Sequence, residues 1–281
     1  MADGDLSLLL PEWQGYGLDT AVAAGARALA SALGGTAFVE VEAPLDETLA
    51  VEDGVLGLSS IAARARRAFE VIRERGPARI LTVGGTCGVE LAPVGYLNDR
   101  YKGDLAVVWL DAHADLNTPA TSPSGRFHGM VLRTLLGAGP PALVGLVPRR
   151  LQAEQVVLAG TRDLDRDEAV FVSDSAVSVL GPADLLVPDR VRGRIRAGGF
   201  TRVYVHLDLD VLDPVEFPDS LIHAPGGVSF DHVADTVADL AAAFDVVGFS
   251  VVEFRPRASD AATRVMGLLR RTGVRIGALA G

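Results

Sequence analysis

Five short apolar runs, separated by longer mixed segments, dominate the pattern of hydrophobic and polar positions along this chain. Each run is only four to seven residues long, which suits a strand better than a helix. The runs contain no regular polar position, as expected for strands that are buried on both faces of a parallel sheet. They span residues 80–83, 105–110, 156–159, 203–207 and 246–252.

Two of the intervening segments carry the period of an amphipathic helix. In residues 59–75 the apolar side chains recur at positions 61, 65, 68, 69 and 72, which form one helical stripe. Residues 229–244 repeat this arrangement, with Ser229 as the expected N-cap. Strands that alternate with helices predict an α/β fold: a three-layer α/β/α arrangement with a mostly parallel sheet.

Composition narrows the class of protein. The 281 residues include 49% hydrophobic residues, enough for one large core, so we expect residues 1–281 to form a single domain. A net charge of −10 argues against nucleic acid or an anionic membrane as a partner. The single cysteine forms no internal disulfide, and the first residues do not resemble a secretory signal, so we expect a cytoplasmic protein.

Acidic residues follow two of the predicted strands at alternate positions. Asp111, His113 and Asp115 follow the run 105–110, and Asp208 and Asp210 follow the run 203–207. Alternate residues of an extended segment share one face, and the carboxyl ends of parallel strands meet at one edge of a sheet. So many carboxylates in one pocket favour bound cations. Oxygen-rich ligation with one imidazole favours manganese over structural zinc, which indicates a binuclear metallohydrolase.

A third motif, Ser-Pro-Ser-Gly-Arg-Phe-His-Gly at residues 122–129, completes an ordered set. Together the motifs resemble the ureohydrolase family, which includes arginase, agmatinase and formiminoglutamase. The resemblance covers roughly residues 84–256. It implies two Mn²⁺ ions per subunit, with Asp111 and Asp208 bridging both, His113 and Asp210 completing one site, and Asp115 helping to hold the other.

The same resemblance implies the catalytic and substrate-binding residues for a small guanidino amino acid. His128 matches the family histidine that shuttles protons, a task suited to an imidazole. Glu253 matches the glutamate that pairs with the guanidinium group, and Asp115 acts with the metal pair. The residues that would bind the amino-acid headgroup are Asn117, Ser122, Ser124 and Asp165.

The chain departs from the family at the first strand end. The family sequence Gly-Gly-Asp-His is replaced by Gly-Gly-Thr-Cys at residues 84–87, so Cys87 stands in place of a metal-binding histidine. A thiolate is softer than imidazole and must first lose a proton, which predicts weaker, more pH-dependent manganese binding there. Three alternatives follow: Cys87 is a ligand, Cys87 borders a weakly occupied site, or the protein has lost catalysis.

Cysteine at this position resembles the branch of the family that hydrolyses Nω-hydroxy-L-arginine to hydroxyurea and L-ornithine in D-cycloserine (antibiotic) biosynthesis. Two further departures support altered guanidino chemistry: residues 223–225 read His-Ala-Pro instead of Gly-Thr-Pro, and Arg126 replaces Asn. The alternatives are an arginase that cleaves L-arginine and a non-catalytic, arginase-like binding protein. The sequence leaves the oligomeric state open.

Overall fold

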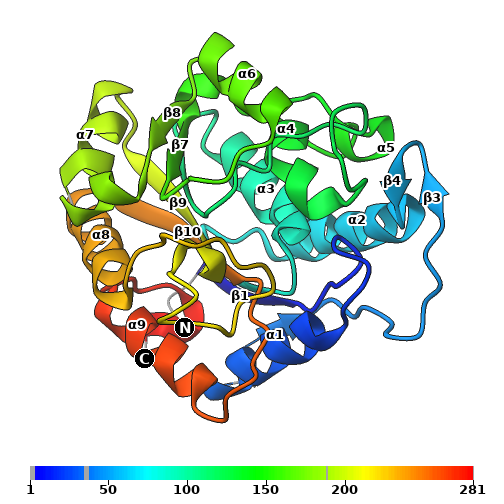
Figure 1. Ribbon diagram of the computed structural model, residues 1–281, viewed down its shortest axis with the longest axis horizontal. Coiled ribbons are helices and arrows are strands. Elements are labelled where there is room, and N and C mark those ends of the chain that lie inside the picture. Colours follow the sequence, from blue (N-terminus) through cyan, green and yellow to red (C-terminus); the bar gives the residue numbers. More distant parts are fainter. Residues whose placement is uncertain (1–3, 35–37, 188, 281) are drawn as a thin grey trace.

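The computed structural model describes residues 4–34, 38–187 and 189–280 (Figure 1). Its centre is an eight-stranded sheet with the order β2-β1-β5-β10-β9-β6-β7-β8, and all neighbouring strands in it run parallel. The strands are β1 (Asp5–Leu10), β2 (Phe38–Glu40), β5 (Arg79–Gly84), β6 (Ala106–Leu110), β7 (Val156–Ala159), β8 (Ser178–Leu180), β9 (Arg202–Asp208) and β10 (Asp245–Val252). A separate antiparallel pair joins β3 (Val51–Glu52) to β4 (Val55–Leu56).

Helices cover both faces of the sheet, which gives the predicted three layers (Figure 1). On one face, alternate side chains such as Val108, Leu207 and Phe249 pack in one apolar core with four helices. These helices are α1 (Ala21–Ala32), α7 (Asp189–Ala197), α8 (Phe230–Ala243) and α9 (Ala261–Arg271).

The opposite face carries a second apolar core. Val107, Trp109 and Tyr204 point to this side, because successive strand residues alternate between the faces. They pack with α2 (Leu58–Arg75), α3 (Leu91–Arg100), α4 (Val131–Leu135) and α5 (Pro141–Val144), and α6 (Arg166–Asp174) adds partly buried side chains. Apolar side chains on both faces explain why these strands read as continuous hydrophobic runs.

The five predicted strands are all present, with ends within one residue of those expected. The predicted helices correspond to α2 and α8, and the hydroxyl of Ser229 accepts a hydrogen bond from the backbone N–H of His232, as an N-cap does. Gly76 ends α2 in the left-handed conformation, with φ of 58°. Because the sheet is parallel, the carboxyl ends of β5, β6, β7, β9 and β10 lie at one edge.

Candidate metal centre and active site

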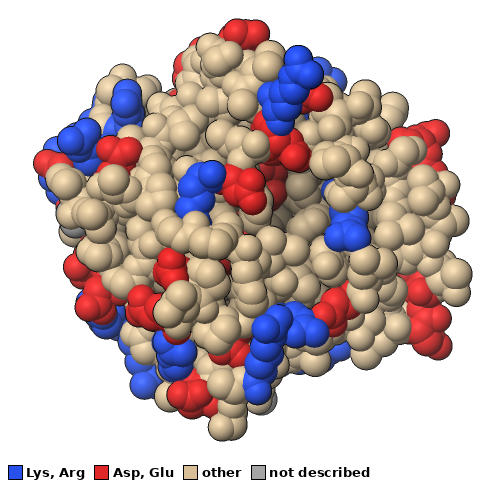
Figure 2. Space-filling model, viewed as in Figure 1, with Lys and Arg blue, Asp and Glu red and all other residues tan. Residues whose placement is uncertain are grey.

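The segments that follow the strands enclose a pocket of about 190 Å³ at this edge of the sheet. Figure 2 shows a hollow near the middle of the face viewed, with acidic side chains at its rim. The pocket includes every sequence-predicted site residue except Asp111, which is buried beneath it. Its lining residues are Cys87, His113, Asp115, Asn117, Ser122, Ser124, His128, Gly129, Asp165, Glu168, Asp208, Asp210, Ile222 and Glu253.

Local backbone hydrogen bonds fix the carboxylates at the ends of β6 and β9. Asp111 accepts from the N–H of His113 at 2.6 Å, and Asp208 accepts from the N–H of Asp210 at 2.7 Å. Each carboxylate therefore bonds to the backbone two residues further on, the Asx-turn arrangement that short acidic side chains favour. The second turn also directs Asp210 toward β6, where its carboxylate accepts from the N–H of Ala112 at 3.0 Å.

A close backbone approach explains the glycine at position 85, two residues before Cys87. A Cβ atom at Gly85 would lie 1.9 Å from the carbonyl oxygen of Glu12, so only glycine fits there. The chain then turns into a short 3₁₀ helix, η2 (Cys87–Glu90), that begins with the cysteine. This placement brings the Cys87 thiol to the carboxylate of Asp208, with Sγ 3.0 Å from Oδ2.

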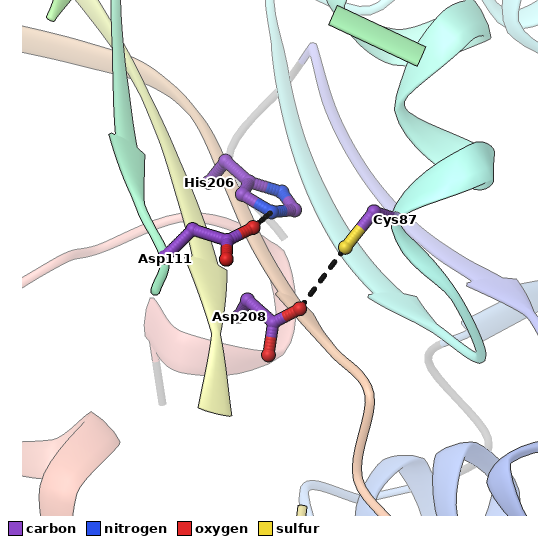
Figure 3. Close-up of side chains that lie close together, drawn as sticks. All are labelled: Cys87, Asp111, His206 and Asp208. Atoms are coloured by element: carbon purple, nitrogen blue, oxygen red, sulfur yellow. Dashed lines mark hydrogen bonds and ion pairs between the residues drawn. The ribbon is translucent and has the colours of Figure 1, made fainter. Parts of the chain in front are cut away.

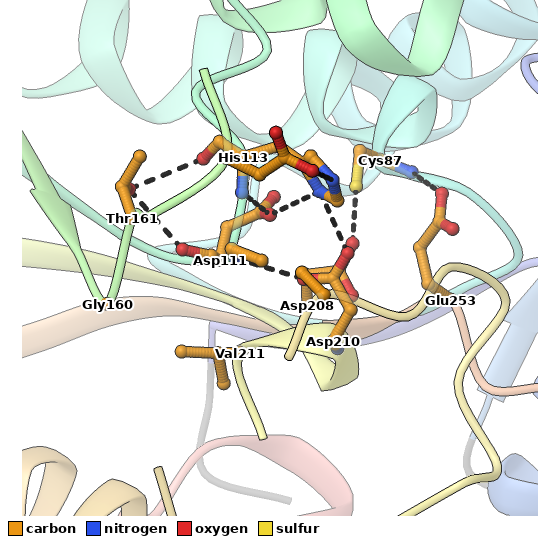
Figure 4. Close-up of polar contacts among 12 residues, drawn as sticks. Cys87, Asp111, His113, Gly160, Thr161, Asp208, Asp210, Val211 and Glu253 are labelled. Atoms are coloured by element: carbon orange, nitrogen blue, oxygen red, sulfur yellow. Dashed lines mark hydrogen bonds and ion pairs between the residues drawn. The ribbon is translucent and has the colours of Figure 1, made fainter. Parts of the chain in front are cut away.

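Two groups of side chains have donor atoms close enough together to share a cation, and Asp111 belongs to both. The first comprises Cys87, Asp111, His206 and Asp208 (Figure 3). The second comprises Asp111, His113 and Asp210, with His113 Nδ1 2.9 Å from the Asp210 carboxylate (Figure 4). A carboxylate common to both groups is placed as a bridging ligand would be.

The crowding of these acids raises several of their pKa values. Burial, and then the neighbouring carboxylates of Asp210 and Asp111, raise the pKa of Asp208 well above its usual value. Burial and Asp111 raise the pKa of Asp210 to about 6, and they also raise the pKa of Asp115 well above its usual value. Burial and the same acids also raise the pKa of the Cys87 thiol. The ionised form of these buried carboxylates is therefore destabilised unless cations neutralise the charge.

The same carboxylates also raise the pKa values of the two neighbouring imidazoles, His113 and His206, and so favour their charged form. Burial lowers the pKa of His113, but its hydrogen bonds with Asp111 and Asp210 outweigh this effect and raise the pKa far above its usual value. Burial lowers the pKa of His206 as well, but the neighbouring carboxylates of Asp111 and Glu90 outweigh this effect and raise the pKa to about 9. Conversely, the two imidazoles hold the pKa of Asp111 below its usual value, although burial opposes this.

The residues present fit divalent metal ions. Buried polar atoms that lack a hydrogen-bond partner in the described residues include Oδ2 of Asp115 and Nε2 of His206. Unpartnered buried oxygens and nitrogens are costly, and metal coordination is one way to satisfy them. Carboxylates, imidazoles and one thiol make up the donor set, which suits a borderline-to-hard divalent cation. Asp115 lines the pocket but lies outside both donor groups.

Glu253 and His128 lie side by side in the pocket, next to the first donor group. Glu253 Oε1 lies 3.2 Å from His128 Nδ1 and 3.4 Å from the backbone nitrogen of Cys87. The side chain of Glu253 is 1% exposed, whereas that of His128 is 17% exposed. Buried Glu253 is thus available to a cationic group in the pocket, and the His128 ring remains open to water.

Two pocket residues adopt a strained backbone conformation. Glu253 has φ of 61° and Asp115 has φ of 53°, in the left-handed region that non-glycine residues rarely occupy. Such conformations cost about 1–3 kcal/mol each and concentrate at functional sites. The strain turns both carboxylates into the pocket instead of continuing the preceding segment.

The predicted headgroup residues line the outer part of the pocket. The side-chain amide of Asn117 donates to Asp165 at 2.8 Å, and the hydroxyl of Thr121 donates to Asn117 at 2.9 Å. The hydroxyls of Ser122 and Ser124 lie 3.4 Å apart. This rim therefore offers one acidic group and several neutral polar groups, the two kinds of partner that an α-ammonium and an α-carboxylate need.

Sequence reasoning missed four residues at or behind the site. His206 received no role, yet it belongs to the first donor group. Its position two residues before Asp208, on the same face of the strand, was the available signal. Glu168 fixes the loop that carries Asp115, because its carboxylate accepts a 2.8 Å hydrogen bond from the N–H of Leu116. Ile222 lines the pocket, and Glu90 lies behind it in contact with His206.

The structure shows where the two further departures from the family pattern lie relative to the pocket. Ile222 lines the pocket, whereas neighbouring His223 turns away and its ring nitrogen lies 3.1 Å from the Pro218 carbonyl oxygen. Arg126 lies 4.5 Å above the ring of Tyr16, outside the pocket lining. Tyr16 in turn meets the edge of the His128 ring. Arg126 is thus linked to the site through the Tyr16 ring, which lies nearly perpendicular to that of His128.

The parallel sheet and the donor groups beyond its strand ends define an α/β protein with a candidate metal centre at one edge of the sheet. Residues 39–269 match the arginase family. A Bacillus caldovelox arginase is 33% identical over 202 residues, which are 67% of this chain and 67% of that enzyme. A Staphylococcus aureus arginase is 32% identical over 182 residues, 63% of this chain but only 60% of that enzyme's length.

Solved structures of arginases have the same fold as this chain. The structure of Bacillus caldovelox arginase superposes with a TM-score of 0.81 at 26% identity, covering 99% of this chain and 98% of that one. Entamoeba histolytica arginase in complex with L-ornithine gives a TM-score of 0.87 at 19% identity, covering 98% and 100%. The chain belongs to the arginase family. None of the helices in the described ranges is long and apolar enough to cross a membrane.

Proposed function

We propose that this protein is a manganese-dependent amidinohydrolase that cleaves Nω-hydroxy-L-arginine to hydroxyurea and L-ornithine. The observation that carries the proposal is a single pocket in which two donor groups share Asp111 and face the Glu253–His128 pair. Hydrolysis adds water to the guanidino carbon and breaks its bond to Nδ, so that the ornithine amine leaves with a proton.

The residues divide this work between holding cations and handling the substrate. Asp111, Asp208, His113 and Asp210 would hold the manganese pair, with Cys87 and Asp115 at the site nearer β5. When bound, such a pair lowers the pKa of a coordinated water and so supplies a nucleophile near neutral pH. The raised pKa of Asp210, about 6, means that cations also compete with protons for these carboxylates.

Glu253 would orient the guanidino group. Its buried carboxylate can accept two parallel N–H bonds from the planar fork of the substrate, and such bonds are stronger in a site closed to water. Because Glu253 and Cys87 are in contact through a 3.4 Å hydrogen bond, the bound fork would lie beside the first donor group. His128, at the open side of Glu253, would transfer a proton to the departing amine.

Asn117, Ser122, Ser124 and Asp165 would bind the amino-acid headgroup. Asp165 offers the negative charge for an α-ammonium, and the hydroxyls and amide offer hydrogen bonds to an α-carboxylate. The Entamoeba arginase that shares this fold was solved with L-ornithine, an amino acid that carries both groups. A small amino acid therefore fits better than a simple amine.

Cys87 favours the N-hydroxylated substrate. Its thiol is buried against acidic neighbours that raise its pKa, so a metal ion must displace a firmly held proton to use this sulfur. A weaker first site activates water less well, which disfavours a strongly basic guanidinium. An N-hydroxyguanidine is less basic and needs less activation. Arginase activity on L-arginine is the second candidate, favoured by the similarity to the bacterial arginases.

The proposal is tested with purified protein loaded with Mn²⁺ and each substrate in turn. Nω-hydroxy-L-arginine should yield hydroxyurea and ornithine in equal amounts, with a kcat/KM at least about tenfold above that for L-arginine, a difference of about 1.4 kcal/mol. A higher kcat/KM for L-arginine would make the protein an arginase. Release of neither hydroxyurea nor urea by protein with a full manganese complement would contradict hydrolysis altogether.

His128→Ala should slow turnover about 100-fold or more while leaving manganese content near normal. The ring contacts Glu253 but belongs to neither donor group, so its loss removes a proton carrier and no ligand. Steady-state rates and metal analysis of the same samples check this. His232→Ala, which changes a histidine bonded to Ser229 at the start of α8, is the matched control and should keep both values. Loss of manganese in His128→Ala would show that His128 binds metal and would contradict its role as a proton carrier only.

Cys87→His should raise manganese affinity, most of all at lower pH where the thiol holds its proton. An imidazole binds as a neutral ligand and avoids the raised thiol pKa. With stronger activation of water, the ratio of kcat/KM values should shift toward L-arginine. Both substrates are compared at several Mn²⁺ concentrations, so that metal depletion does not imitate a change in specificity. An unchanged titration and an unchanged ratio would make Cys87 a bystander.

A further inference from the structure

His206 lies beneath the pocket, at the first donor group. It is on β9 two residues before Asp208, so both side chains point to the same face of the sheet. The ring is fully buried and stacks on Trp109 with 3.6 Å between the ring centroids and 17° between the planes. Figure 3 shows this ring beside Asp111 and across from Cys87. Packing therefore holds the imidazole in one orientation.

Two buried groups, the Glu90 carboxylate and the Ser250 hydroxyl, lie beside Nδ1 of His206 and leave Nε2 as the nitrogen without a partner. Nδ1 of His206 lies 3.2 Å from Oε1 of Glu90, and Oε2 of Glu90 accepts a 2.6 Å hydrogen bond from the hydroxyl of Tyr204. All three side chains are buried. A carboxylate beside Nδ1 favours the tautomer with the proton on that nitrogen, which leaves the lone pair on Nε2. The carboxylate–histidine pair is the arrangement that commonly supports a metal-binding imidazole.

The free nitrogen points at the other donors. Nε2 is buried and has no hydrogen-bond partner in the described residues, and it lies 3.7 Å from Oδ2 of Asp111. With the Cys87 sulfur and an Asp208 oxygen, it belongs to a group whose donor atoms all lie within 4.8 Å of one another. Ligands about 2.0–2.3 Å from a cation are separated by such distances.

We propose that His206 is the imidazole ligand of the metal site beside Cys87. In this chain the nitrogen that the family pattern places at the position of Cys87 would come from β9 instead. The inference rests on the metal dependence of the proposed function and assigns to this site a donor set of Cys87, Asp111, Asp208 and His206. Glu90 and Tyr204 are then positioning residues that act through the imidazole ring.

Nitrogen couplings in the pulsed EPR spectrum of bound Mn²⁺ test the assignment directly, on protein labelled with ¹⁵N-histidine. The wild-type protein should show two coordinated imidazoles, His113 and His206. His206→Asn and His113→Asn should each show one, whereas His232→Asn, on α8, should show two. A wild-type spectrum with one coordinated imidazole would overturn the assignment but leave manganese dependence intact. Failure to bind any Mn²⁺ would overturn both.

Manganese affinity provides a second readout that tests the supporting carboxylate. Glu90→Gln should weaken the site beside Cys87 about 10–100-fold, the usual effect of losing the partner of a metal-binding histidine, and His206→Asn should weaken it more. Introducing Cys87→His into His206→Asn should recover much of that loss, because an imidazole returns to the site. Full two-metal affinity in His206→Asn, or no recovery in a folded double variant, would contradict the proposal.

Discussion

Asp208→Asn is expected to abolish turnover and the binding of both manganese ions together. The carboxylate is buried between the Cys87 thiol and the N–H of Asp210, and the family pattern makes it a bridge between the two cations. An amide keeps the shape of the side chain but loses the negative charge that both cations need. Activity should fall below detection, and metal analysis should find less than one equivalent. Both are measured on the same preparation.

Asp167→Asn is the matched control, because Asp167 is an exposed carboxylate in the first turn of α6. It should retain two equivalents of manganese and near-normal rates, with at most a small loss of helix stability. A folded Asp208→Asn variant that keeps two tightly bound ions and full activity would rule out a bridging role for this residue.

Glu253→Gln should reduce kcat/KM by about 100–1000-fold while manganese stays bound, which separates substrate orientation from metal binding. The carboxylate is buried 3.2 Å from His128 and outside both donor groups. Glutamine fills the same space, but its amide N–H group would face the N–H groups of a guanidine and repel them. Initial rates with Nω-hydroxy-L-arginine and parallel metal analysis check the prediction.

The exposed Glu154→Gln change serves as the control and should leave both quantities unaltered. Loss of manganese in Glu253→Gln would instead make Glu253 part of the metal centre. Unchanged kcat/KM would show that the guanidino group binds elsewhere in the pocket.

The interior strands β5, β6, β7, β9 and β10 could be predicted from the sequence, whereas the edge strands and the interior strand β1 could not. Strands such as β6 and β9 are buried on both faces, so burial alone makes their sequences continuously apolar. Edge strand β8 has only three residues, two of them partly exposed, and β2 has none that is fully buried. Short, half-exposed strands lack a distinctive pattern, since their pairing comes from neighbours distant in sequence.

The residues of the candidate metal centre also differ in how well the sequence reveals them. Asp111 and Asp208 could be predicted because they directly follow apolar strands in a parallel sheet. For His206 the sequence shows only its position two residues before Asp208, because its proximity to Glu90 and Cys87, which η2 brings close, exists only in the folded chain. Likewise, the positive φ angles that turn Asp115 and Glu253 into the pocket are set by surrounding packing rather than by residue type.

The most direct test of the account is a titration of metal-free protein with Mn²⁺ in which bound metal and ornithine release from Nω-hydroxy-L-arginine are measured together. We expect negligible ornithine release without metal, and activity that rises to its maximum as two equivalents bind per chain. Ornithine release that proceeds at full rate in metal-free protein, or that reaches no measurable rate with two equivalents bound, would contradict it.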